Sequence, residues 1–151
     1  MSSEHVIKRH NKSLMLYHLV CPSKFRRNVF TGEVEKSLKD ICPEIEKQYE
    51  IHFVEIGADE DHIHFLLQSV PTMAPVRIVT TVKSITARML FRRHPEIEKI
   101  VWGRHLWSSG YYINTVGQYA NEQVIQNYVK NQGKTYKQFY RDQLTLFEGL
   151  T

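Results

Sequence analysis

The chain has 151 residues, of which 42% are hydrophobic and 24% are charged. These values are typical of one soluble globular domain, so we expect residues 1–151 to form a single domain. Lysine and arginine outnumber aspartate and glutamate by 20 to 16, and the sequence pI is about 9.1. This small positive excess suits an anionic partner such as nucleic acid, and it equally suits an ordinary solvated surface.

Cysteine usage and the apolar runs exclude two further classes. Cys21 and Cys42 are far apart in the sequence, which argues against a zinc site built on cysteine. The first residues contain no apolar signal core, and the longest apolar runs are too short to span a membrane. We therefore expect a cytoplasmic protein with reduced thiols and no membrane contact.

The first predicted elements are a strand and a helix. Residues 13–21 are apolar, with β-branched and aromatic side chains, and they are followed by Pro22, which predicts a strand. Thr31 can cap a helix, and apolar residues then recur at helical spacing as far as Tyr49. Pro43 lies inside this helix and is expected to kink or locally unwind it.

Five more elements follow in the chain. Residues 51–57 and 61–68 predict two strands, and the short acidic turn between them predicts an antiparallel hairpin. Residues 75–93 begin with a proline and continue with helical periodicity. Residues 106–114 predict a fourth strand, and residues 116–132 predict a final helical region.

This order of elements predicts the fold class. Strand, helix, strand, strand, helix, strand is the order of a ferredoxin-like, split βαβ plan. We therefore expect an α+β sandwich with helices on one face of an antiparallel sheet, and an extra C-terminal helix. The tail, residues 134–151, is too apolar to be a free tail, so we expect it to pack on the domain or on a partner.

A pair of histidines is the first candidate for chemistry. His62 and His64 alternate with Ile63 in a predicted strand, so both imidazoles point to one face, with Cα atoms about 6.5–7 Å apart. Two adjacent imidazoles can bind one divalent ion. On this spacing alone, two strand histidines with ordinary hydrogen bonds are the commoner arrangement.

The last helix adds the second candidate pair. Tyr128 and Gln132 are four residues apart, so they share one helical face and can present a phenol and an amide oxygen together. Alone, this spacing more often reflects a core tyrosine and a surface glutamine. With His62 and His64, Gln132 completes three neutral ligands for Mg²⁺ or Mn²⁺, and Tyr128 becomes a candidate nucleophile.

Three motifs resemble a known family. They are the segments Asp-His-Ile-His-Phe-Leu-Leu at 61–67, Trp-Ser-Ser-Gly-Tyr-Tyr at 107–112 and Tyr-Val-Lys-Asn-Gln at 128–132. In this order they resemble the single-tyrosine transposases of the IS200/IS605 insertion sequences, which belong to the HUH endonuclease superfamily. The resemblance extends from about residue 12 to residue 133.

The resemblance implies a function and a role for each motif residue. Tyr128 would be the nucleophile, and His62, His64 and Gln132 would bind the metal ion. Members of this family cut and rejoin single-stranded DNA with hairpins through a 5′-phosphotyrosine, which frees a 3′-hydroxyl. They work as homodimers, in which the tyrosine helix of one subunit can complete the active site of the other.

Basic residues supply candidate DNA contacts. Lys12, Arg26, Arg27 and Lys83 lie in segments that resemble the family, and each is equally well explained as a solvated side chain. The aromatic residues Trp107, Tyr111 and Tyr112 can stack on unpaired bases, although packing in the core or in a dimer explains them better.

Two other functions are compatible with the sequence. A domesticated relative would use the same chemistry on palindromic repeats of a host genome. A non-catalytic RNA-binding module can share the ferredoxin-like plan, but it would need a pair of base-stacking aromatics on the first and third strands. The sequence offers no such pair at the required positions, and the third strand carries His62 and His64 instead.

Overall fold

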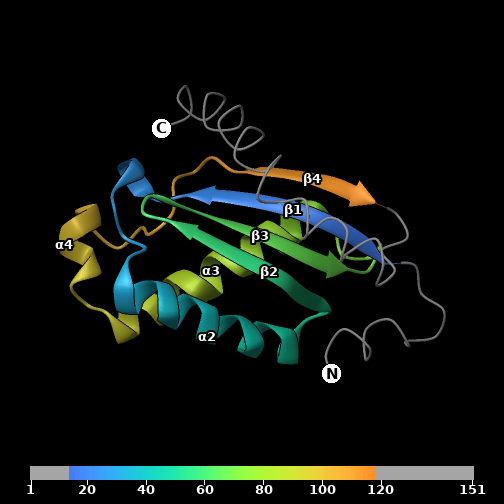
Figure 1. The fold of residues 1–151 in the computed structure, drawn as a ribbon, viewed down its shortest axis with the longest axis horizontal. Coiled ribbons are helices and arrows are strands. Elements are labelled where there is room, and N and C mark those ends of the chain that lie inside the picture. The colour runs from blue at the N-terminus through green and yellow to red at the C-terminus, as the bar shows by residue number, and fades with distance from the viewer. Residues whose placement is uncertain (1–13, 118–151) are drawn as a thin grey trace.

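The computed structural model describes residues 14–117, in which two long helices cover one face of a four-stranded sheet (Figure 1). In chain order the elements are β1 Met15–Pro22, the 3₁₀ turn η1 Lys24–Arg26, α2 Gly32–Gln48, β2 Ile51–Asp59, β3 His62–Ser69, α3 Pro75–Arg93, α4 Ile97–Val101 and β4 Tyr112–Gly117. The predicted strand and helix order is therefore confirmed through the fourth strand. The predicted C-terminal helix and tail lie outside the described residues.

The strands are ordered β2-β3-β1-β4 in the sheet, and every neighbouring pair is antiparallel. β1 and β2 are consequently parallel to each other with β3 inserted between them, which is the split βαβ arrangement. The predicted α+β fold with helices on one face is confirmed. Within the described residues, no helix is long and apolar enough to cross a membrane.

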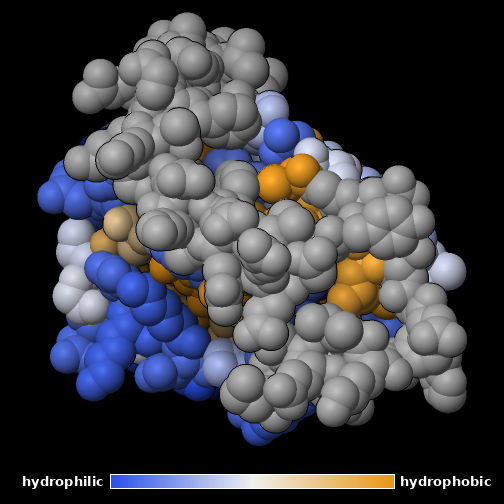
Figure 2. Space-filling view, turned by 45° about the vertical axis from the view of Figure 1, so that its right-hand side comes forward, coloured by the Kyte–Doolittle hydropathy of each residue, from blue (hydrophilic) through white to orange (hydrophobic). Residues whose placement is uncertain are grey.

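Helix α2 packs on the sheet through a stripe of apolar residues spaced three or four apart, including Val34, Leu38 and Ile45. It runs through Pro43 as one helix, so the expected local unwinding is wrong. Pro43 lies on the exposed side, as does Lys39, whose carbonyl loses its usual helical partner there. Water can bind that carbonyl, which explains why the helix continues. The helices lie below the sheet in Figure 1, and hydrophilic residues dominate the coloured lower part of the surface in Figure 2.

The fourth strand begins later than expected. Residues 106–111 are not in the strand, and Trp107, which helped to predict a strand there, packs in the core instead. Trp107 is buried, stacks on Phe30 with ring centroids 5.1 Å apart, and donates from Nε1 to Thr86 Oγ1 at 3.1 Å. The short helix α4, which precedes this segment, has no counterpart among the predicted elements.

Strand β3 is buried on both faces. Ile63, Phe65 and Leu67 belong to the large core between sheet and helices, whereas Leu66 belongs to a second small cluster with Leu16 on the opposite face. Alternation along the strand therefore places His62 and His64 on the face away from the helices, as predicted.

A bulge in β2 positions a glycine against His64. The pairing register of β2 with β3 shifts between Phe53 and Glu55, and beyond that point Gly57 pairs with His64. A Cβ atom built at Gly57 would coincide with the His64 imidazole. Gly57 does not have a positive φ, so a glycine is not needed here for the backbone conformation. Its role is to leave space for the His64 ring.

Gly57→Ala is expected to lower the free energy of unfolding by about 1–3 kcal/mol, because the added methyl group must displace the His64 ring. In a His64→Ala background the same change should cost nothing or stabilise the strand, since alanine loses less backbone entropy than glycine. Urea unfolding of the four chains in this double-mutant cycle measures the difference. An equal cost in both backgrounds would show that Gly57 does not accommodate His64.

Candidate metal centre

His62 begins β3 directly after the turn at Glu60 and Asp61, and it is buried. Its Nδ1 lies 2.7 Å from Asp61 Oδ1. A carboxylate accepting from Nδ1–H holds the tautomer in which Nε2 keeps its lone pair, which is the usual arrangement behind a metal-binding histidine. Nε2 also lies 3.4 Å from Oδ2 of the largely exposed Asp59, a contact that a metal ion would replace at little cost.

Asp61 is held in turn by Arg26. The Arg26 Nε and Nη2 atoms donate to Asp61 Oδ2 at 3.3 and 3.2 Å. The hydrogen bond from His62, together with the charges of His62 and Arg26, holds the pKa of Asp61 below its usual value, although burial opposes this. Asp61 therefore stays ionised and bridges the imidazole and the guanidinium. The DNA contact expected of Arg26 stays a prediction, and the ion pair with Asp61 is what the structure shows.

His64 lies in an enclosed position between Gly57 and His18. Its ring is T-shaped against that of His18, with centroids 5.9 Å apart. Burial, followed by the charges of His18 and His62, lowers the pKa of His64 to about 3. The imidazole is therefore neutral at physiological pH, which is the form that binds a metal ion.

His18 is a neighbour of the site that sequence reasoning missed. It lies on β1, is almost fully buried, and burial lowers its pKa to about 4. In the antiparallel pairing of β1 with β3, Val20 is opposite His64 and His18 is opposite Leu66. His18 and His64 are thus diagonal neighbours on one face of the sheet. The alternation in β1 was a usable signal, but the register between two distant strands was not available from the sequence.

The described residues supply part of the predicted ligand set. Within residues 14–117, no group of three His, Cys, Asp or Glu side chains is placed to hold a metal ion. His62 and His64 fit the role of two ligands, since they share a face, one has an oriented tautomer and the other is neutral. The third predicted ligand, Gln132, and the predicted nucleophile, Tyr128, lie outside the described residues, as does Lys12.

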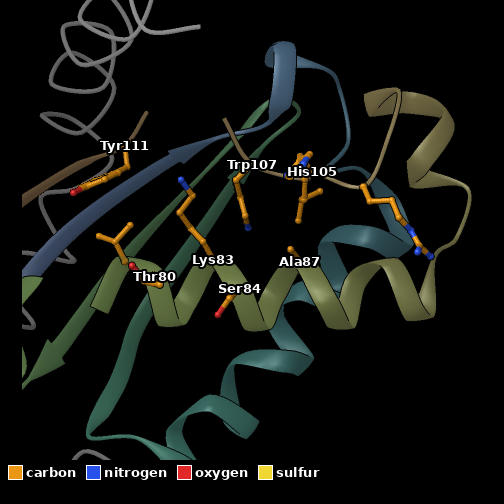
Figure 3. A pocket seen from close by; sticks show the side chains of 10 residues that line it. Thr80, Lys83, Ser84, Ala87, His105, Trp107 and Tyr111 are labelled. Atoms are coloured by element: carbon orange, nitrogen blue, oxygen red, sulfur yellow. The ribbon is translucent and has the colours of Figure 1, made fainter. Parts of the chain in front are cut away.

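Lys83 lines a cavity of about 350 Å³ between α3 and the segment that leads to β4 (Figure 3). Its Nζ donates to the Ser108 carbonyl at 2.8 Å and lies 5.6 Å from the centre of the Tyr111 ring. Burial lowers the pKa of Lys83. The ammonium therefore ties α3 to this segment, and its predicted contact with DNA is untested. Arg27 lies instead over the Trp102 ring, with Cζ 3.9 Å from the ring centre.

Comparison with known proteins identifies the family. The sequence profile of the family described as "Transposase IS200 like" matches residues 11–132. The chain is 35% identical to the ISDra2 transposase TnpA of Deinococcus radiodurans over 116 residues, which are 77% of this chain and 82% of that protein. It is 31% identical to the transposase for insertion sequence element IS200 of Salmonella typhimurium, over 77% of this chain and 75% of that protein.

The fold leads to the same family. A crystal structure of a protein described as a transposase from Deinococcus radiodurans superposes with a TM-score of 0.64 and 33% sequence identity, covering 79% of this chain and 91% of the other. The matched region of the family profile contains the His62 and His64 pair and also Tyr128 and Gln132. The chain therefore belongs to the IS200-like transposase family.

Proposed function

We propose that this transposase cuts and rejoins single-stranded DNA with a divalent metal ion and with Tyr128 as nucleophile. The observation that carries the proposal is the paired, oriented imidazoles of His62 and His64 on one face of β3. Membership in a transposase family implies a DNA substrate, and the two histidines suggest how its phosphate would be engaged.

The metal ligands would be His62, His64 and Gln132, which are all neutral. A bound Mg²⁺ or Mn²⁺ ion would then keep its full positive charge to polarise a phosphodiester and stabilise the charge that develops on its oxygens. Two imidazoles make Mn²⁺ at least as suitable as Mg²⁺, which prefers oxygen ligands. Asp61 would orient His62. Gly57, which has no side chain, would leave room for the His64 ring.

Tyr128 would perform the covalent step. Its Oη forms a bond to phosphorus while the bond from phosphorus to the 3′ oxygen breaks. The phenol loses its proton, and the departing oxygen gains one to become a free 3′-hydroxyl. A second 3′-hydroxyl can later attack the phosphotyrosine in the reverse sense, so rejoining needs no ATP. In this proposal the substrate carries hairpins and the enzyme is a homodimer, as the family resemblance implies.

The RNA-binding alternative is less well supported. On the face of the sheet away from the helices, β1 presents Leu16 and His18, and β3 presents His64 and Leu66. None of these four side chains is the aromatic platform on which an RNA-binding sheet stacks bases. A domesticated relative would share the proposed chemistry, and the matching ends of a mobile element around the gene would distinguish the two.

Tyr128→Phe is expected to abolish strand cleavage and the covalent adduct, because the ring remains but the nucleophilic oxygen is gone. Binding to single-stranded DNA should be unchanged. A labelled hairpin oligonucleotide, followed on a denaturing protein gel, detects the adduct. Tyr49→Phe is the matched control and should form the adduct normally. An adduct of full yield in Tyr128→Phe would rule out this residue as the nucleophile.

Asp61→Asn is expected to weaken Mn²⁺ binding by about 10-fold to 100-fold, because the carboxylate that orients His62 loses its charge. Asp59→Asn, at the end of β2 next to the same turn but largely exposed, should change the affinity by much less. The signal of free Mn²⁺ in electron paramagnetic resonance reports both affinities without any cleavage assay. Equal affinities in wild type and Asp61→Asn would remove Asp61 from the site.

A further inference from the structure

Two exposed aromatic side chains lie together at one end of the sheet. Phe25 is 50% exposed and Trp102 is 70% exposed, and their ring centroids are 5.8 Å apart at an angle of 47°. They come from η1 and from the end of α4, which Figure 1 shows at the end of the sheet where β2 turns into β3. Burial of apolar surface does not explain a tryptophan that remains so exposed.

The backbone at both positions is strained. Phe25 has φ of 56° and Trp102 has φ of 55°, the left-handed region that bulky residues seldom occupy. Each such residue costs on the order of 1–3 kcal/mol and persists only where neighbouring structure enforces it. Hydrogen bonds from Lys24 N to the Leu106 carbonyl and from Gly103 N to the Glu98 carbonyl, at 2.8 and 2.9 Å, hold the two segments. The strained backbone at the two positions therefore leaves both aromatic rings exposed to solvent.

The surface around the rings is basic. Phe25 and Trp102 line a cavity of about 470 Å³, whose other lining residues are Arg26, Arg27, Asn28, Lys99 and Ile100. Among these described residues there is no carboxylate. Arg27 lies over the Trp102 ring, and Lys24 Nζ lies 5.1 Å from the centre of the Phe25 ring. Exposed aromatic faces among cations are what a flexible polyanion with unpaired bases requires.

We propose that Phe25 and Trp102 form a stacking platform for unpaired bases of single-stranded DNA, with Arg27 and Lys99 contacting the neighbouring phosphates. This inference rests on the proposed function, since it assigns a further contact surface to the same substrate. Every base has a π-face, so the platform would bind unpaired DNA with little dependence on sequence.

The position of the platform relates it to the metal centre. Arg26 follows Phe25 in the chain and reaches Asp61, which contacts His62. One ring of the platform, Phe25, is therefore adjacent in the chain to Arg26, which holds the carboxylate that contacts His62. Bases that stack on Phe25 and Trp102 would belong to nucleotides near the phosphate to be cut. A protein partner would also cover the rings, but it would not need a cavity lined by three cations.

Trp102 provides its own spectroscopic probe. The chain has two tryptophans, and Trp107 is buried, with 7% exposure. Titration of the full chain with an unstructured oligothymidine should quench the exposed Trp102 fluorescence, whereas a blunt duplex of equal length should quench it much less. Trp102→Ala should weaken binding of the oligothymidine by about 10-fold to 100-fold, as for loss of one stacked base. Trp102→Phe should retain most of the affinity because it keeps an aromatic face.

Val76→Ala is the matched control, since Val76 is 60% exposed on the first turn of α3. It should leave the affinity unchanged. Suppose that wild type binds the oligothymidine, but that the Trp102 fluorescence does not change and Trp102→Ala keeps the wild-type affinity. The platform is then wrong and the proposed function stands. If Trp102→Ala instead changes only the oligomeric state, the patch is a protein interface and the platform is also wrong. If wild type fails to bind unpaired DNA, the proposed function itself fails.

Discussion

The Asp61 carboxylate is the contact on which the arrangement of the site depends. One oxygen accepts from His62 Nδ1 and the other from the Arg26 guanidinium, so one side chain joins the start of β3 to the segment after β1. The main-chain bond from Ser23 N to the Asp61 carbonyl, at 2.9 Å, strengthens the same connection. Because His62 is buried, its orientation is set by this contact and not by solvent. Phe25 lies in this segment after β1, and its exposed ring contacts that of Trp102 at the end of α4.

The second constraint is electrostatic. Three imidazoles, those of His18, His62 and His64, gather on one face of the sheet, and burial with mutual repulsion keeps His64 neutral. Imidazole ligands add no negative charge of their own beside an incoming phosphate, which favours binding of an anionic substrate once an ion is present. The Asp61 carboxylate, 2.7 Å from His62 Nδ1, is balanced by Arg26, whereas the Asp59 carboxylate, 3.4 Å from Nε2, is largely exposed to solvent. The proposed chemistry therefore relies on a positively charged metal site. Its supporting carboxylate, Asp61, contacts His62 at Nδ1 and not at the Nε2 atom that would bind the metal ion.

Much of the fold could be predicted because local periodicity determines it. The alternation from His62 to Leu67 predicted both faces of β3, and the helix at residues 75–93 was predicted with the observed bounds. The start of β4 was misplaced because Trp107 packs in the core against Phe30 and makes only an isolated bridge to Ser23, outside the continuous strand. The roles of Gly57 and Arg26 could not be read from the sequence, since they depend on partners fixed only by strand register and by a backbone with positive φ. Tyr128 and Gln132 lie outside the described residues, so their roles stay predictions.

The most direct test of the central claim is the binding of Mn²⁺ to the full chain, measured together with cleavage of a labelled hairpin oligonucleotide. Wild type should bind one Mn²⁺ per chain and cut only when metal is present. His62→Ala and His64→Ala should each lose that binding and the cleavage, whereas replacement of the exposed His105 by alanine should preserve both. Unchanged Mn²⁺ affinity in both histidine variants, with cleavage that continues in EDTA, would contradict the assignment of this pair as the metal centre.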